Sequence, residues 1–115
     1  VFDRPIGQNQ GIQHPLAEKW MYLESAWLMA MRVAWLYDAG KPCGAEANSA
    51  KFLGARAGHD AAWQAIMTHG GFGYAKEYHV ERLFREVSLI RLAPITEQLM
   101  LSFIAEKVLD LPKSS

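Results

Sequence analysis

Three short stretches of the sequence carry groups suited to binding or catalysis, and the first is the glycine-rich stretch Gly70-Gly71-Phe72-Gly73. Glycine permits a positive φ angle and lets a ligand or another backbone approach closely, so this loop is a candidate ligand contact. The same residues also form ordinary turns that end helices, and that alternative stays open. A phosphate loop is excluded because no Lys-Ser or Lys-Thr pair follows the glycines. A dinucleotide-binding fingerprint is excluded because no strand precedes them.

The second stretch is rich in amides and lies near the start of the chain. Its members are Gln8, Asn9, Gln10 and Gln13. An amide both donates and accepts hydrogen bonds, and therefore suits the polar edge of a heterocycle or a ribose. A solvated loop has the same composition, and the residues alone favour the loop.

The third stretch is a charged run that contains Glu77, Glu81, Arg82, Arg85 and Glu86. On a helix, Glu81 and Arg85 are neighbours at i,i+4, as are Arg82 and Glu86. Such surface pairs contribute a few tenths of a kcal/mol each, so we interpret this run as structural.

The histidines and the cysteine do not suggest a metal site. His14, His59, His69 and His79 include no i,i+4 pair, and no cysteine lies at zinc-binding spacing from them. The single cysteine, Cys43, cannot form an internal disulfide, so a reducing compartment is expected.

A long helix is predicted directly after the amide-rich stretch. Residues 1–14 read as irregular or partly helical chain, and Pro15 fits the first turn of a helix because its missing N–H costs nothing there. Gly40 and Pro42 are expected to end that helix. Two apolar stripes run along it, which predicts burial against more than one neighbour and a core position for its tryptophans. The stripes are Leu16, Trp20, Leu23, Trp27, Ala30, Ala34 and Tyr37, and Met21, Leu28, Met31 and Trp35.

Three further helices are predicted. One spans about 46–68 and ends at the glycine loop, one runs from about Tyr78 to Pro94, and one covers about 95–110 before Pro112. No period-2 alternation typical of strands is present. The fold class is therefore predicted to be all-α, as an antiparallel four-helix bundle with short connections. Small residues on the second of the four helices would let another backbone approach closely: Ala50, Leu53, Gly54, Ala57, Ala61 and Ala65.

Composition limits the partners. The 115 residues include 12 basic and 12 acidic side chains, and the resulting zero net charge argues against nucleic acid, which needs a basic excess or stripe. No secretory signal or transmembrane span is expected, because charges interrupt every apolar stretch. The chain does not begin with Met, so we expect one domain, 1–115, from a longer protein whose N-terminal and middle domains lie outside this chain.

Four stretches together resemble the C-terminal domain of acyl-CoA dehydrogenases. Residues 2–17 resemble the segment that opens this domain. Residues 69–78 resemble the family's G-G-x-G-(Y/F)-x-x-E-(Y/F) loop, and 80–86 resemble the v-E-(R/K)-l-x-R-D helix that follows it. Residues 95–98 fall where the family has G-T-x-Q. The resemblance covers nearly the whole chain, with the motifs in the family's order.

The resemblance implies that the full-length parent is an FAD-dependent oxidoreductase of fatty acid metabolism. Such enzymes remove the α and β hydrogens of an acyl-CoA thioester to give a trans-2-enoyl-CoA, and pass electrons to an electron-transferring flavoprotein. It also implies a homo-oligomer (a dimer or, usually, a homotetramer) in which the glycine loop covers the FAD of a neighbouring subunit. The isolated fragment is expected to be inactive. A bacterial cytoplasmic location is favoured over the mitochondrial matrix.

The resemblance also implies which residues contact FAD. The family places an amide pair before the first helix, a glycine loop over the adenosine-diphosphate portion, and a polar pair at the start of the last helix. The matching residues are Asn9 and Gln10, then His69, Gly70 and Gly71, then Thr96 and Gln98.

Three positions depart from the family pattern. Met67 replaces a glutamine before the glycine loop, and Ile95 replaces the glycine of G-T-x-Q. Pro94 occupies the position at which many members carry the catalytic glutamate, and proline cannot take a proton. Glu97 lies on the other side of Thr96 and is not assigned the role on proximity. No catalytic residue is therefore expected in this chain; isovaleryl-type members supply the base from an earlier helix.

Two other function classes stay open. The chain is alternatively part of a non-catalytic subunit in a heteromeric acyl-CoA dehydrogenase, an idea motivated by Pro94 and Met67. It is alternatively a helical interaction module with no flavin. A carboxylate on an upstream helix facing the flavin would distinguish the enzyme from the non-catalytic subunit. Purification of the full-length protein without flavin would favour the interaction module.

Overall fold

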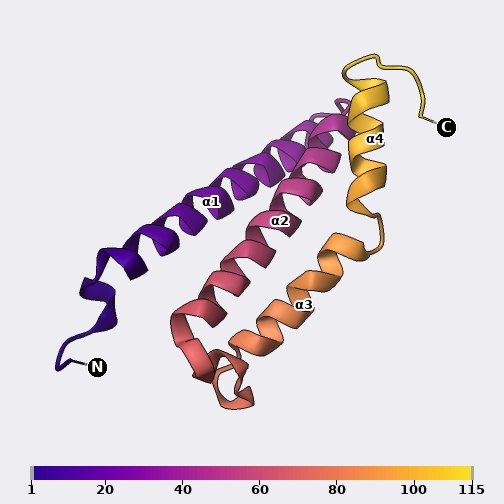
Figure 1. Ribbon diagram of the computed structural model, residues 1–115. Coiled ribbons are helices and arrows are strands. Elements are labelled where there is room, and N and C mark those ends of the chain that lie inside the picture. Colours follow the sequence, from indigo (N-terminus) through magenta and orange to yellow (C-terminus); the bar gives the residue numbers. More distant parts are fainter. Residues whose placement is uncertain (1, 115) are drawn as a thin grey trace.

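The computed structural model describes residues 2–114, and its regular elements are all helical (Figure 1). No strand occurs within these residues, so the all-α prediction is confirmed. Four α-helices form the body of the chain: α1 (Gln10–Asp38), α2 (Gly44–His69), α3 (Val80–Leu92) and α4 (Glu97–Lys107). Three short 3-10 helices accompany them: η1 (Ile6–Gln8), η2 (Gly70–Tyr74) and η3 (Lys76–Tyr78).

Helix α2 is the middle of the arrangement (Figure 1). It contacts α1 on one side, and α3 and α4 on the other. The tight connection after α1 makes α1 and α2 antiparallel, and α3 runs back along α2 from the glycine loop. Helix α4 continues past α3 after a bend of 41°. The chain is therefore elongated, with extents of 56 × 29 × 24 Å, and every α-helix other than α2 packs chiefly on α2.

The start of α1 differs from the prediction. The helix begins at Gln10, so Pro15 lies inside it rather than in its first turn. Side-chain hydrogen bonds fix this earlier start: the Gln13 amide donates to the Gly7 carbonyl at 2.7 Å, and the Asn9 amide donates to the Ile6 carbonyl at 3.1 Å. The sequence pattern missed the start because these bonds outweigh the single backbone hydrogen bond that proline removes.

The end of α4 also comes earlier than predicted, at Lys107 rather than near Asp110. The backbone N–H groups of Leu109 and Leu111 donate to the carbonyls of Ile104 and Ala105, and Asp110 takes a left-handed conformation with φ of 54°. These bonds satisfy backbone carbonyls at the end of the helix that have no partner within it. The bounds of α2 and α3 match the predicted helices closely.

The buried core is small and consists mainly of short side chains. Ala57 of the predicted small face of α2 is buried, whereas Leu53 of that face is 42% exposed. Ala55, which lies outside the predicted face, is also buried. Gly58 brings α2 against Val87 of α3, because a Cβ there would lie 3.0 Å from the valine Cγ2. The other buried apolar residues are Ala26, Leu36, Val80 and Met100.

The apolar stripes of α1 do not form this core. Trp20, Trp27 and Trp35 are 62%, 59% and 59% exposed, so the prediction that these tryptophans are buried is wrong for this chain by itself. The side of α1 that faces α2 instead carries Ala26 and Leu36. The physical reason is that α1 packs chiefly against one helix, α2, which leaves most of its circumference without a helical neighbour among the described residues.

These exposed side chains predict self-association of the isolated chain, because a contiguous apolar surface is stabilised by a second protein surface. We expect sedimentation velocity to show a species larger than a monomer at high concentration. The Trp20→Glu/Trp27→Glu double variant should shift the population toward monomer, whereas Glu86→Gln on the exposed part of α3 should not. A wild-type chain that stays monomeric at high concentration would contradict this expectation.

No single helix among residues 2–114 is long and apolar enough to cross a bilayer. The bent pair of α3 and α4 meets the requirement on length and composition only.

Candidate functional site

The three glycines of the loop after α2 differ in their structural surroundings. Gly70 ends α2 with a φ of +61°, a region that side chains disfavour. Gly73 is buried, and a Cβ there would lie 2.5 Å from the carbonyl oxygen of Ile66. Gly71 is exposed, has no positive φ, and a Cβ there would meet nothing within 4 Å. The fold of this chain thus explains Gly70 and Gly73, and leaves the backbone at Gly71 open to approach from outside.

His69 is held at the start of this loop. Its Nδ1 lies 2.8 Å from the carbonyl oxygen of Ala65, so Nδ1 carries the hydrogen of that bond because a carbonyl only accepts. The ring also lies 5.8 Å from the ring of Tyr78, which is itself 5.2 Å from Phe72. The remaining ring nitrogen, Nε2, is therefore the atom with which His69 would contact a ligand.

The predicted amide pair lies where α1 begins. Asn9 is the residue immediately before α1, and its Oδ1 accepts a hydrogen bond of 2.7 Å from Nη2 of Arg4. Because its Nδ2 also donates to Ile6, this amide is engaged in the local turn. Gln10 is exposed in the first turn. Of the two, Gln10 is the better placed to contact a ligand. Asn9 instead holds the side chain of Arg4, a cation that was not among the predicted site residues.

The second predicted pair lies in the first turn of α4. Thr96 caps the helix, with its Oγ1 accepting from the backbone N–H of Leu99 at 3.4 Å. Gln98 is exposed and lines a pocket of about 310 Å³. The other residues that line this pocket are His59, Ser88, Arg91, Leu92 and Glu97.

The structure does not bring these predicted contacts together within one chain. The glycine loop and the first turn of α4 lie at opposite ends of α3, whose 13 residues span about 20 Å. The start of α1 lies at the same end of the molecule as the glycine loop (Figure 1). One bound molecule would have to be extended, or be shared between two subunits, to meet all of these contacts.

A buried carboxylate that the sequence did not select lies beside the second pair. Glu97 is 7% exposed, and its carboxylate accepts hydrogen bonds from two guanidinium groups. Arg91 donates from Nε to Oε1 at 2.7 Å and from Nη2 to Oε2 at 3.1 Å. Arg56 donates to the same two oxygens at 3.4 and 3.3 Å. The residues come from α2, α3 and α4, at spacings that no helical pattern relates.

This environment decides what Glu97 can do. The hydrogen bonds from Arg91, against the opposing effect of burial and with the further contribution of Arg56, lower the pKa of Glu97 to about 2. Glu97 is therefore held as a paired anion at neutral pH.

A lysine of α2 also holds the connection between α3 and α4, residues 93–96. Lys51 donates from Nζ to the carbonyl oxygen of Ile90 and to that of Ala93, the latter at 3.2 Å. Pro94 lies exposed within this connection. The position that carries a glutamate in many acyl-CoA dehydrogenases thus offers no proton-accepting group in this chain.

Four of the remaining charged candidates form ion pairs within α3. Arg82 and Glu86 pair at 2.9 Å on the surface of α3, and Arg85 lies 3.9 Å from Glu81. Cys43 is half-buried immediately before α2. Among residues 2–114, no three His, Cys, Asp or Glu side chains converge as metal ligands.

Comparison with known proteins turns the motifs into a family assignment. The model of the acyl-CoA dehydrogenase C-terminal domain matches residues 1–109. The chain belongs to the acyl-CoA dehydrogenase family. The resemblance carried by the four stretches is thereby confirmed.

Individual relatives agree with this assignment. The chain is 42% identical, over 99% of its length, to acyl-CoA dehydrogenase FadE12 of Mycobacterium tuberculosis, of which it covers 30%. It is 38% identical over 94% of its length to the probable acyl-CoA dehydrogenase YngJ of Bacillus subtilis, covering 28%. It is 35% identical over 94% to a 3-(aryl)acrylate reductase of Clostridium sporogenes, covering 29%. The chain spans about three-tenths of the length of these curated relatives, and corresponds to the C-terminal domain of acyl-CoA dehydrogenases.

Proposed function

We propose that this chain is the FAD-contacting and oligomerisation domain of an enzyme that dehydrogenates an acyl-CoA at its α and β carbons. The observation that carries the proposal is Gly71. Its backbone is exposed at the end of α2, and neither its φ angle nor its packing accounts for a glycine there. Gly54 also lacks such a reason, but Gly71 lies in the loop that matches the family motif, where a glycine leaves the backbone open to close approach by a ligand.

The exposed groups of the candidate site fit the polar parts of FAD. The Gly70–Gly71 backbone and Nε2 of His69 offer hydrogen-bonding groups at the glycine loop, and Gln98 offers an amide at the first turn of α4. Phosphate oxygens only accept hydrogen bonds, so they suit N–H donors such as the backbone N–H of Gly71 and the side-chain amide of Gln98. Nε2 of His69 accepts when Nδ1 carries the hydrogen, so it suits a ribose hydroxyl. We therefore assign His69, Gly70 and Gly71 to the adenosine-diphosphate portion, and Thr96 and Gln98, with Gln10 and Asn9, to further contacts.

In the proposed enzyme, bound FAD supplies the acceptor for the β-hydride, and the protein supplies binding and orientation. This chain contributes no base, because Pro94 has no ionisable group and Glu97 is held by two guanidinium groups. We propose that the α-proton is taken by a residue outside this chain. Electrons would then pass to an electron-transferring flavoprotein, in the cytoplasm of a bacterium.

A homo-oligomer, either a dimer or a tetramer, is part of the proposal. The separation of the glycine loop from the first turn of α4 supports it, since two subunits can present both places to one FAD. The exposed tryptophans of α1 support it as well, because they provide apolar surface for a subunit contact.

A non-catalytic subunit of a heteromeric acyl-CoA dehydrogenase is the second candidate. Pro94 and the engagement of Glu97 favour it, because together they leave the α3–α4 connection without a proton acceptor.

Anaerobic titration of the full-length protein with a panel of acyl-CoA thioesters tests these candidates. Loss of the visible flavin absorbance on adding an acyl-CoA would establish the enzyme and a base outside this chain. Bound flavin that keeps its absorbance across the panel would favour the non-catalytic subunit. A full-length protein that purifies and refolds without taking up flavin would overturn both candidates.

The glycine loop gives a prediction with a clean control. Gly71→Ala is expected to change the free energy of unfolding by less than about 0.5 kcal/mol, because its Cβ enters open space. The same methyl group should weaken FAD binding, because it occupies the approach to the backbone. FAD titration of the full-length apoprotein measures this, with Gly54→Ala, whose Cβ also meets nothing within 4 Å, as the control remote from the loop. Unchanged FAD affinity in Gly71→Ala would contradict the assignment of this loop.

A further inference from the structure

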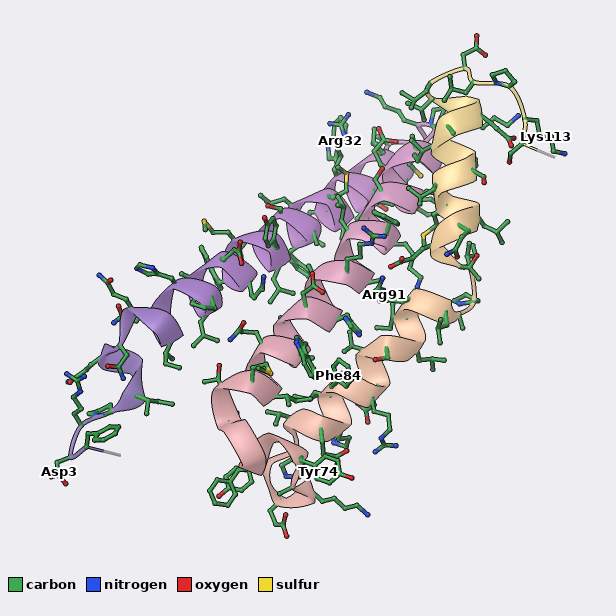
Figure 2. All side chains as sticks on the ribbon, viewed as in Figure 1. Asp3, Arg32, Tyr74, Phe84, Arg91 and Lys113 are labelled. Atoms are coloured by element: carbon green, nitrogen blue, oxygen red, sulfur yellow. The ribbon has the colours of Figure 1, made fainter. Side chains whose placement is uncertain are left out.

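The Glu97 carboxylate joins three helices at one point. Arg56 reaches it from α2 and Arg91 from the last turn of α3, while Glu97 itself is the first residue of α4. Figure 2 shows Arg91 in the space between α2 and the α3–α4 connection. Arg91 makes a bidentate contact, which fixes direction as well as distance. We call Arg56, Arg91 and Glu97 the carboxylate clamp.

The clamp and the buried Met100 fix the first turn of α4. Met100 is 1% exposed and follows Glu97 by three residues, so both side chains lie on the same face of the helix. Two such anchors one turn apart determine the rotation of α4 about its axis and its height along α2. Lys51 holds the end of α3 on the other side of the connection. These contacts therefore restrain the orientation of α4 relative to α3.

The position of Glu97 determines the positions of the residues next to it in the chain. Thr96 and Gln98 are the immediate neighbours of Glu97, and Gln98, Arg91 and Glu97 line the same pocket. No other first-turn side chain of α4 has a comparable set of charged partners among the described residues. A displacement of Glu97 would move both neighbours with it.

From this geometry we infer that Glu97, held by Arg91 and Arg56, is a positioning residue that places Thr96 and Gln98 against FAD. The inference rests on the proposed function and deepens it: the clamp acts on FAD binding through the orientation of its two neighbours. An isolated surface ion pair has no such effect, because it is flexible and screened by solvent.

The test is FAD binding by the full-length protein, freed of flavin and titrated with FAD well below its unfolding temperature. Glu97→Gln and Arg91→Met are each expected to raise the FAD dissociation constant about tenfold, the lower end of the effect that losing a supporting hydrogen-bond partner has at metal sites. Arg91→Lys keeps the charge but loses the bidentate contact, and should restore binding only in part. The matched control is Glu86→Gln, which breaks the exposed pair with Arg82 and should leave the constant within about twofold of wild type.

The outcomes separate positioning from stability. A clamp that only stabilises the fold would lower the unfolding midpoint of Glu97→Gln and Arg91→Met while leaving their FAD dissociation constants at the wild-type value, and that result overturns the inference. If Glu97→Gln does not fold, Arg56→Met decides, because it keeps the Arg91 contact; an unchanged constant there overturns the inference as well. A wild-type protein that takes up no FAD overturns the proposed function instead, which is a distinct result.

Discussion

Replacing Gly73 with alanine is expected to destabilise the domain by about 3 kcal/mol, the upper part of the range for overpacking a close contact. The added Cβ would lie 2.5 Å from the Ile66 carbonyl oxygen and 2.9 Å from its Cα. Both atoms belong to the backbone of the last turns of α2, so no side-chain rotation relieves the overlap. Urea unfolding followed by far-UV circular dichroism measures the loss.

Gly71→Ala is the matched control, because it adds the same atom two residues away in open space. The two variants should therefore differ strongly in unfolding free energy while sharing composition and charge. Equal midpoints for both would show that the η2 turn moves freely away from α2, and that close packing against Ile66 does not require a glycine at position 73.

The second large effect is expected at Glu97. Glu97→Gln should lower the free energy of unfolding at pH 7 by about 2 kcal/mol, since it weakens hydrogen bonds to a charged group and leaves two guanidinium groups without their anion. The pKa of Glu97 is about 2 in the folded chain, against 4.5 for the free side chain. The ionised carboxylate therefore stabilises the fold above pH 4.5, and this contribution is lost as the pH falls from 4.5 toward 2.

Urea unfolding of wild type and Glu97→Gln at several pH values checks this. The difference in unfolding free energy should be constant near neutrality and should shrink below pH 4.5. Glu86→Gln, which breaks an exposed pair, should show a small difference at every pH. A Glu97→Gln difference that persists unchanged at acid pH would mean that the charge of the carboxylate does not contribute.

The four helices could be predicted because their apolar spacing and their Gly and Pro boundaries are local signals. The start of α1 could not, because it depends on hydrogen bonds that Gln13 and Asn9 make back to the preceding turn. The exposure of Trp20 and Trp27 could not either. Apolar periodicity shows that a helix has an apolar face, but it does not show whether the covering partner belongs to the same chain.

The candidate site divides in the same way. Motif order selected the glycine loop and the Thr96–Gln98 pair as candidate FAD contacts; the family assignment agrees with the motifs, and the contacts stay predictions. The different roles of Gly71 and Gly73 needed coordinates, because only the distance to Ile66 distinguishes them. The pairing of Arg91 with Glu97 crosses the break at Pro94, where helical spacing rules no longer relate one residue to another.

The central place of α2 has a consequence for how the sequence of this domain can change over generations. Helix α2 packs against α1 on one side and against α3 and α4 on the other, so a substitution at one of its buried positions affects the packing of the whole chain. The outer surface of α1 meets no such requirement within this chain. We expect sequence drift to be slow along α2, whereas side chains on the outside of α1 should change together with the surface of the subunit that covers them.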